Sequence, residues 1–375
     1  MDERNYTLKR KDIQLLKKIF FEIREELVVM FEQKGLIKRR RIIMDYFSLV
    51  QACYLYIVEK LSYQRLADQM ALDYGIVMSD TAWKKQLKKC APVFFEIAQE
   101  LLRRRVAEKS VENINLMAID ATDIPKEGHQ GTEIRLHCTF SLDTATLEQV
   151  HQTDKYGPET VKNFDLSTEC CYLADKAYGK ATQIEHMFQS ETYFLFRISP
   201  SLIRLYSDKT CKNRLDFQKL MKNDLFETVC YVKCGQTYNE IRLIGSHLPP
   251  EERDAARKRA KEKSVKNQRH IMDVTMQYAE WLFLVTNLPN DYLCDELAAL
   301  YYGRWQIELM FKRAKSQLNF HVIRKGSESY SKMVTLLWIA IACVLCCVQI
   351  DFQYASDFPY SDYNVFSLAK SLFFA

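Results

Sequence analysis

The sequence predicts a mixed α/β protein with an all-α N-terminal domain, and three changes of pattern along the chain lead to that class. Residues 12–109 carry apolar side chains at helical spacing and have no proline before Pro92. From residue 113 onward, short apolar or alternating runs typical of strands are interleaved with helical segments. Between about 200 and 290, short strand-like pieces surround a charged segment. We therefore expect a helical domain, a mixed sheet and an inserted β-rich region.

The order of the predicted elements defines the sheet as mixed, because a three-strand meander is followed by alternating helices and strands. The elements of this βββαβαβ pattern are strands at 113–120, 133–142 and 146–151, a helix at 158–164, a strand at 170–174, a helix at 180–189 and a strand at 193–198. The inserted region adds strands at 227–233, 239–246 and 281–286, and a helix is expected from Cys294 through Lys315. We expect residues 251–270, with eight Lys or Arg against four acids, to form a polar helix or loop, with or without a ligand.

Size and composition describe an ordinary globular protein. The 375 residues are 48% apolar and 27% charged, which is enough for two or three domains and does not indicate disorder. The net charge of +5 permits nucleic acid as a partner without proving it. The 12 cysteines show no zinc-ligand spacing, and the N-terminal stretch is too polar for a secretory signal. We expect reduced, mostly buried thiols in a cytoplasmic protein.

The longest apolar run, residues 333–348, raises the question of a membrane span. Its 16 residues stop short of the roughly 18 that a span needs, and nothing upstream offers a second one. A buried helix is the favoured interpretation, and no membrane is expected as a partner.

The helical domain contains a candidate helix-turn-helix. The first helix is expected at 62–70, a turn at 73–75, and the second helix at 79–89 with Ser79 or Asp80 as its cap. The second helix carries the cations that would face a DNA groove, namely Lys84, Lys85, Lys88 and Lys89. The alternative is a plain surface helix. Two further basic clusters, 38–41 and 103–105, fit DNA contacts or solvated helix ends equally well.

Three acids stand in contexts that suggest a metal site. Asp120 and Asp175 each follow an apolar strand directly, so their side chains would converge at the carboxyl edge of the sheet. With Glu308 on a helix they supply three hard oxygen donors, which suit two Mg²⁺ or Mn²⁺ ions and phosphoryl transfer. For any one such Asp, a cap or turn role is the usual alternative; Asp123 and Asp143 serve equally well as turn formers.

The segment around Glu308 places that acid among cations and aromatic rings. Tyr301, Arg304, Glu308 and Lys315 are spaced at three, seven and fourteen residues, which puts them on one face of a continuous helix. The alternative is a solvated helix laced by pairs such as Glu308 with Lys312.

These residues carry a resemblance to a known family. Tyr301-x2-Arg304-x3-Glu308-x6-Lys315 resembles the Y-x2-R-x3-E-x6-K signature of DDE transposases of the insertion-sequence-four family, complete in residue types and spacing. Asp120-Ala121-Thr122 and the run Asp175-Lys176-Ala177-Tyr178-Gly179 resemble that family's first and second acid motifs, in the right order. The resemblance covers residues 110–325 well and the N-terminal part loosely.

The resemblance implies a ribonuclease-H-like core interrupted by a β-rich insertion, and a Mg²⁺-dependent cut-and-paste DNA transposase. Asp120, Asp175 and Glu308 would be both catalytic and metal-binding, while Tyr301, Arg304 and Lys315 would grip DNA near its end. Trp281 would be a candidate DNA-stacking wedge, but Leu282 fits the register about as well, so a core tryptophan is the favoured interpretation. The partners would be the terminal inverted repeats, target DNA and a second copy of the chain in a synaptic complex.

The predicted domains are an all-α DNA-binding domain at 1–109, core segments at 110–199 and 291–350, the insertion at 200–290 and a tail at 351–375. Two alternatives stay open: a ribonuclease-H-like nuclease without strand transfer, and a domesticated helix-turn-helix regulator. The repeat sequence, the target preference, the strand-processing route, the oligomeric state and the activity of the element are beyond what the sequence predicts.

Overall fold

The computed structural model describes residues 10–36, 45–109, 114–128, 131–143, 146–235, 237–266, 268 and 272–355. The basic cluster at 38–41 lies outside the described residues, as do Arg269, His270 and residues 356–375 of the tail.

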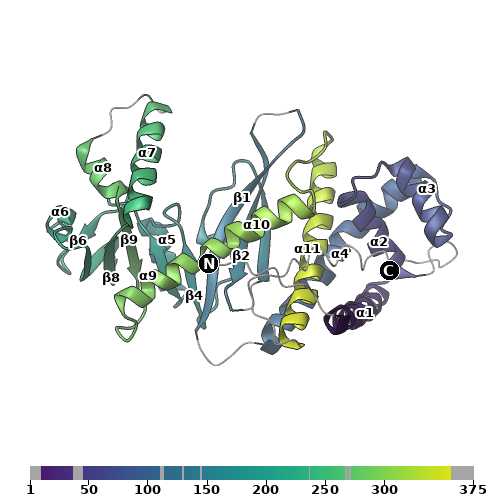
Figure 1. Ribbon diagram of the computed structural model, residues 1–375, viewed down its shortest axis with the longest axis horizontal. Coiled ribbons are helices and arrows are strands. Elements are labelled where there is room, and N and C mark those ends of the chain that lie inside the picture. Colours follow the sequence, from purple (N-terminus) through teal and green to yellow (C-terminus); the bar gives the residue numbers. More distant parts are fainter. Residues whose placement is uncertain are drawn as a thin grey trace. The chain divides into compact units, whose positions relative to one another are not determined.

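Figure 1 shows the helices and strands of the described residues, which begin with the helices α1 to α4 and end with the helices α9 to α11. The helices are α1 Arg10–Gln33, α2 Tyr46–Ile57, α3 Tyr63–Tyr74, α4 Asp80–Lys109, α5 Ala181–Gln189, α6 Phe217–Leu220, α7 Pro250–Lys266, α8 Asp273–Ala279, α9 Cys294–Gly303, α10 Trp305–Gln317 and α11 Glu328–Ala355, with a 3-10 turn, η1, at Val161–Asn163. The strands are β1 Asn115–Pro125, β2 Thr132–Ser141, β3 Thr146–Asp154, β4 Cys170–Ala174, β5 Tyr193–Arg197, β6 Leu205–Tyr206, β7 Leu225–Cys234, β8 Thr237–His247 and β9 Trp281–Thr286.

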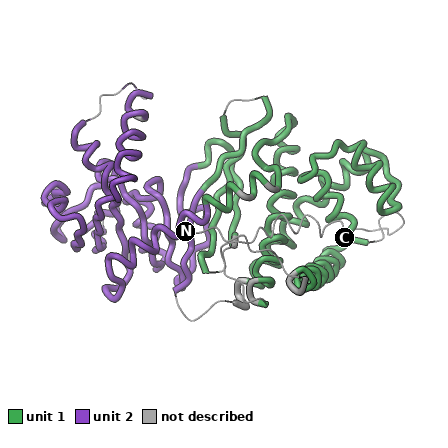
Figure 2. The backbone as a smooth tube through the Cα atoms, viewed as in Figure 1, with its two compact units in different colours: residues 1–111, 121–157, 308–375 green, residues 112–120, 158–307 purple. Residues whose placement is uncertain are grey.

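The chain forms two compact units (Figure 2). Unit 1 comprises residues 1–111, 121–157 and 308–375, and unit 2 comprises residues 112–120 and 158–307. Strand β1 contributes to both, because the boundary falls between Asp120 and Ala121.

Unit 1 is built around α11, which packs along α4 and also contacts α1, α2 and β3. Arg105 of α4 is buried and pairs with Glu26 of α1 at 2.7 Å and with Asp351 of α11 at 2.8 Å, so one cation ties three helices together. Helix α11 is the one described helix long and apolar enough to span a membrane, but 89% of its most apolar stretch is buried inside the protein. The predicted buried helix is confirmed.

The strands of unit 1 are β2 and β3, paired antiparallel, with the end of β1 beside β2. His137 of β2 lies opposite His151 of β3 and is fully buried. Its ring nitrogen Nε2 shares a hydrogen bond with the Thr153 hydroxyl at 2.9 Å. Burial lowers the pKa of His137 to about 4, with smaller contributions from Arg135 and His151.

Unit 2 contains one sheet in the order β1-β4-β5-β9-β8-β7-β6. Strands β1, β4 and β5 are parallel, and β9, β8, β7 and β6 follow antiparallel. The strands predicted as a β-rich region therefore extend the same sheet, because β9 pairs directly with β5. The core beside this sheet is rich in aromatic rings, and Phe194, Phe196 and Phe283 are fully buried in it.

Most predicted elements are present, with β4 and β9 at their predicted bounds. The helix predicted at 158–164 is wrong, since only the 3-10 turn η1 forms there. The backbone N–H of Val161 donates to Gln183 of α5 at 2.8 Å, so a tertiary hydrogen bond replaces a helical one. All 12 cysteines are free and ten are buried, as expected.

Candidate active site

The two strand-associated acids lie side by side at one level of the sheet in unit 2. The last paired residues of β1 and β4 are Ile119 and Ala174, so Asp120 of β1 and Asp175, the first residue after β4, occupy the next position along two neighbouring parallel strands. Both are partly buried. Equal register places their side chains on the same face, which explains how residues far apart in sequence converge. The predicted strand end at Asp120 is wrong, however, because β1 continues to Pro125.

Arg197 extends this row by one residue. Phe196 of β5 pairs with Ala174, so Arg197 occupies the position next to Asp175. The sequence argument missed Arg197, although a charged residue at the end of an apolar strand is the same signal that identified both acids. The row is therefore acid, acid, cation across three parallel strands.

The loop after β4 is held by short-range contacts. One carboxylate oxygen of Asp175 accepts a hydrogen bond from the backbone N–H of Ala177 at 2.7 Å, and the Asp175 carbonyl accepts one from Tyr178 at 3.1 Å. A side chain at Gly179 would come within 2.2 Å of the Arg197 carbonyl oxygen. Glycine thus permits a close approach of the loop to β5, and the turn fixes the orientation of the Asp175 side chain.

Tyr301 and Arg304 stand over this row in the same unit. An Arg304 guanidinium nitrogen lies 3.7 Å from a carboxylate oxygen of Asp120, and the guanidinium carbon is 5.7 Å from the centroid of the Tyr301 ring. Tyr301 is buried, which raises the pKa of its phenol; Arg304 and Arg197 oppose that rise, and Asp175 adds to it. Four residues from the three predicted motifs therefore lie close together in unit 2, namely Asp120, Asp175, Tyr301 and Arg304.

The segment between β9 and α9, the helix that carries Tyr301, is held by a buried arginine. The Arg242 guanidinium of β8 donates to the carbonyl oxygens of Leu288, Pro289 and Tyr292 at 3.3, 2.7 and 2.8 Å. It also pairs with Glu227 at 2.6 Å. A planar guanidinium suits this divergent set of acceptors. The sequence argument missed Arg242, because bonds to distant backbone carbonyls leave no sequence signature.

The predicted continuous helix from Cys294 to Lys315 is interrupted at Arg304. The Arg304 N–H bonds to the Tyr301 carbonyl at 3.1 Å, and the Ile307 N–H bonds to the Arg304 carbonyl at 3.2 Å, so the turn tightens to i, i+3 bonding. Tyr301 and Arg304 therefore belong with α9 and unit 2, whereas Glu308 and Lys315 lie on α10 in unit 1.

In unit 1, Glu308 is exposed and borders a shallow open hollow of about 480 Å³. The hollow is lined by Glu308, Phe311, Lys312, Lys315, Ser316 and His321. Lys315 is partly buried, and this burial lowers the pKa of its ammonium, while the negative charge of Asp123 acts in the opposite direction. The same ammonium donates a hydrogen bond to the Asp123 carbonyl at 3.0 Å. Asp123 also forms an ion pair with Arg135 at 2.8 Å. Asp123 lies within β1, so its predicted turn role is wrong, whereas Asp143 does lie in a turn.

The donor chemistry of the acids fits a hard divalent ion, since carboxylate oxygens are the ligands that Mg²⁺ and Mn²⁺ prefer. Asp120 and Asp175 are adjacent in register, while Glu308 belongs to the other unit. Among the described residues, no group of three His, Cys, Asp or Glu side chains is gathered closely enough to hold a metal.

The predicted DNA-binding lysines of α4 are all exposed. They are Lys84, Lys85, Lys88 and Lys89, of which Lys89 donates to the Leu36 carbonyl at 2.9 Å. The Ser79 hydroxyl accepts from the Ala82 N–H at 3.2 Å, so the predicted cap is present. The helix itself runs on to Lys109.

Trp281 lies in the core of unit 2 and is 6% exposed. Its indole stacks on His247 with 4.9 Å between ring centroids and packs against Phe226 at 5.7 Å. The core interpretation of this residue is confirmed, and a ring packed on both sides has no face to offer a DNA base.

The fold and the site define a class: a mixed α/β enzyme with paired carboxylates on adjacent parallel strands. A family model described as "Transposase DDE domain" matches residues 113–347. The chain therefore belongs to the DDE transposase family and is an enzyme of the polynucleotidyl transferase or endonuclease type.

The relatives agree. The chain is 27% identical over 350 residues to transposase InsL of insertion sequence element IS186A of Escherichia coli (strain K12), covering 89% of this chain and 92% of that protein. It is also 27% identical over 351 residues to the transposase of insertion sequence element IS421 of Escherichia coli, with the same coverage. A cryo-EM structure of the piggyBac transposase synaptic complex with hairpin DNA is a looser likeness, with a TM-score of 0.46, 12% identity and coverage of 96% of this chain and 79% of that one.

Proposed function

We propose that the chain is the transposase of an insertion sequence, which binds the terminal inverted repeats and catalyses phosphodiester hydrolysis and 3′-hydroxyl strand transfer in cut-and-paste transposition. The observation that carries the proposal is the row of Asp120 and Asp175 on adjacent parallel strands, with Arg304 3.7 Å from Asp120. The proposed core is ribonuclease-H-like, which the meander β1 to β3 and the parallel strands β1, β4 and β5 support.

Divalent metal is part of the proposal. Asp120, Asp175 and Glu308 would hold Mg²⁺ or Mn²⁺, with two ions as the expected number. The chemistry that such ions supply is activation of the attacking oxygen and stabilisation of charge on the leaving oxygen. Partly buried carboxylates on rigid strands suit this role, because their orientation is set before the ions arrive.

The residues around the acids would handle DNA. The Arg304 fork can bind a phosphate through two parallel hydrogen bonds, and Tyr301 supports it from the ring side. Arg197, next to Asp175 in register, adds a second cation for the same strand. Lys315 of unit 1 is the proposed further phosphate contact. Water would attack the element end, and the freed 3′-hydroxyl would attack target DNA.

Recognition of the repeats is assigned to α3, the turn around Gly75 and the first part of α4. The left-handed backbone at Gly75, with φ of +64°, ends α3, and Ser79 begins the next helix. The exposed lysines of α4 supply the phosphate and base contacts. The proposed active form is a homodimer or higher oligomer that works on DNA in the bacterial cytoplasm.

The test uses purified protein, Mg²⁺ and labelled repeat ends. Asp120→Asn, Asp175→Asn and Glu308→Gln should each lower cleavage about 100-fold or more while end binding persists. Asp143→Asn, which changes an exposed turn acid, is the matched control. Cleavage by Glu308→Gln at the parent rate would remove Glu308 from the site.

A second measurement separates the rival functions. A supercoiled target plasmid added to pre-cleaved ends should yield joined products if the protein transfers strands. Cleavage without any joined product would instead identify a nuclease, and repeat binding without cleavage would identify a regulator.

A further inference from the structure

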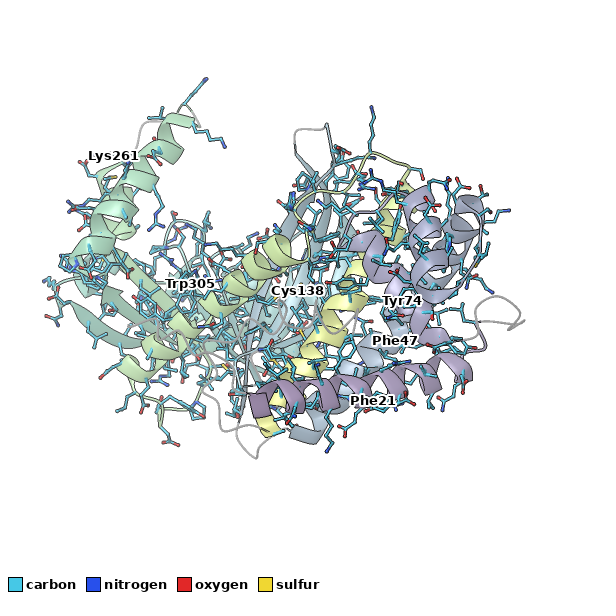
Figure 3. All side chains as sticks on the ribbon, turned by 45° about the vertical axis from the view of Figure 1, so that its right-hand side comes forward. Phe21, Phe47, Tyr74, Cys138, Lys261 and Trp305 are labelled. Carbon is cyan, nitrogen blue, oxygen red and sulfur yellow. The ribbon has the colours of Figure 1, made fainter. Side chains whose placement is uncertain are left out.

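Helix α7 has no buried residue among those whose side chains the structure describes, and its neighbour α8 has none either. Its 17 residues are polar on every side, and Val265 near its end is 78% exposed. Helices of globular proteins normally bury an apolar stripe, and that burial provides most of their stability. Figure 1 shows α7 and α8 standing off the sheet of unit 2, and Figure 3 labels Lys261 on the projecting part of α7.

The base of α7 is firmly attached to unit 2. Arg253 donates to the Leu248 carbonyl at 2.5 Å, and Arg257 pairs with Glu280 at 2.6 Å, next to the first residue of β9. These two cations therefore have intramolecular partners. They fix the direction in which the rest of the helix projects.

Beyond Arg257 the helix carries an excess of positively charged residues. Residues 258–266 contain five Lys or Arg against Glu262 alone. The four whose side chains the structure describes are exposed: Lys258, Arg259, Lys261 and Lys266. No ion pair or hydrogen bond joins the side chain of any of these four to another residue in the described part of the chain. Glu262 is four residues from Lys258 and four from Lys266, a spacing that allows an ion pair on a helix, yet neither ion pair forms.

The four cations lie on one side of the helix. At about 100° per residue, they span an arc of about 160° in the order Lys261, Lys258, Lys266 and Arg259. Residues 258–266 contain no Asn or Gln that could pair with a base and no aromatic ring that could stack on one. A broad arc of Lys and Arg alone suits contact with phosphates, which carry no base information.

We propose that α7 is an arm that binds the phosphate backbone of duplex DNA without sequence preference, using Lys258, Arg259, Lys261 and Lys266. The inference rests on the proposed function, because it names a second DNA contact of the same enzyme. At about 1.5 Å per residue the helix is about 25 Å long, enough to reach phosphates on both sides of a groove. Two sources of duplex fit this chemistry, the element end and the target.

The test compares the full-length parent with a variant in which the four cations are replaced by Gln. Binding to an inverted-repeat duplex and to an unrelated duplex of equal length is measured over a series of NaCl concentrations. Each lost phosphate contact should reduce the slope of log K against log [NaCl] by about 0.9, so we expect a reduction of about 2–4. The affinity should fall about equally for both duplexes.

The matched control removes the same charge from exposed lysines on other elements, namely Lys18, Lys162, Lys222 and Lys332. Its salt slope should stay within about 1 of the parent slope. A second variant that combines Lys258→Arg, Lys261→Arg and Lys266→Arg should retain the parent slope, because it keeps the charge.

The outcomes separate the two proposals. If the parent neither binds nor cleaves repeat ends, the proposed function fails. If the parent does both and the Gln variant keeps the parent salt slope, the arm is not a DNA contact. A loss for the repeat duplex alone would also overturn the inference, since it would indicate base reading, and a loss for the unrelated duplex alone would assign the arm to target DNA.

Discussion

Helices α4 and α7 both carry runs of lysine and arginine, yet they are held in place by different forces. In α4, apolar residues recur at helical spacing between the lysines, and Trp83, Leu87 and Phe94 are fully buried against the rest of unit 1. In α7 no described residue is buried, and the attachment consists of Arg253 and Arg257 at its base. A basic run therefore says little by itself. The residues between the charges decide whether the helix packs into the core of a domain or projects from it.

A large effect is expected from shortening one buried side chain in the apolar stripe of α4. Leu87→Ala deletes a fully buried side chain and should lower the free energy of unfolding by about 2–5 kcal/mol. Chemical denaturation of the two proteins measures this. A change below about 0.5 kcal/mol would mean that α4 is held no more by burial than α7 is.

The next effect concerns how strongly α4 distinguishes the inverted repeat from unrelated DNA. Replacement of Lys84, Lys85 and Lys88 by Gln should weaken binding to the inverted repeat by about 10-fold more than binding to unrelated DNA, if α4 reads base edges. The four-residue Gln variant of α7 should weaken both equally. Competition binding with the two duplexes gives the ratio, and equal losses in the α4 variant would contradict a recognition helix.

A proline placed in each helix tests the comparison directly. Lys88→Pro should cost about 3 kcal/mol or more and unfold the helical part of unit 1, because the broken turn carries buried residues. Lys261→Pro breaks the same number of helical bonds but should change global stability by less than about 0.5 kcal/mol. Hydrogen exchange would show faster opening only within α7 for the second variant. Global unfolding caused by Lys261→Pro would show that α7 is part of a core.

The smallest effect is a pH dependence of the α7 attachment. The hydrogen bond from Arg257 holds the pKa of Glu280 below its ordinary 4.5, so this contact stabilises the attachment at pH values above about 4.5 and loses its effect as the pH falls through the lower folded value. Amide exchange in α7 should therefore accelerate in acid relative to α4. Glu280→Gln should produce part of the same acceleration at neutral pH, and the absence of any change would place the attachment elsewhere.

The sequence was sufficient for features that depend on local pattern. The apolar run of β4 and the capping Ser79 are both visible as residue types at short spacing, and both are present. Asp120 and Asp175 were found from the apolar run that precedes each, although β1 continues past Asp120, and parallel register then explains their adjacency.

Features that depend on tertiary partners were missed. Arg242 bonds carbonyls 46 to 50 residues further along the chain, and no local pattern predicts that. The tight turn at Arg304 is a deviation of a single residue within a segment of otherwise strong helical spacing. The side chain of Gln183 replaces a helical bond at Val161 from 22 residues away. For Arg242 and Gln183 a long-range contact decides the local structure.

Gly179 has a consequence for how the region around Asp175 tolerates change. A saturation library across residues 175–180 would contain two kinds of intolerant position, distinguishable by their phenotype. Substitutions of Asp175 should yield folded, inert protein, whereas any residue other than glycine at 179 meets the Arg197 carbonyl within 2.2 Å and should displace the chain that carries that acid. Inactivity at position 179 would thus be accompanied by a loss of yield or thermal stability. Measuring activity together with yield or thermal stability therefore separates residues needed for the reaction from residues needed for the fold within six consecutive positions.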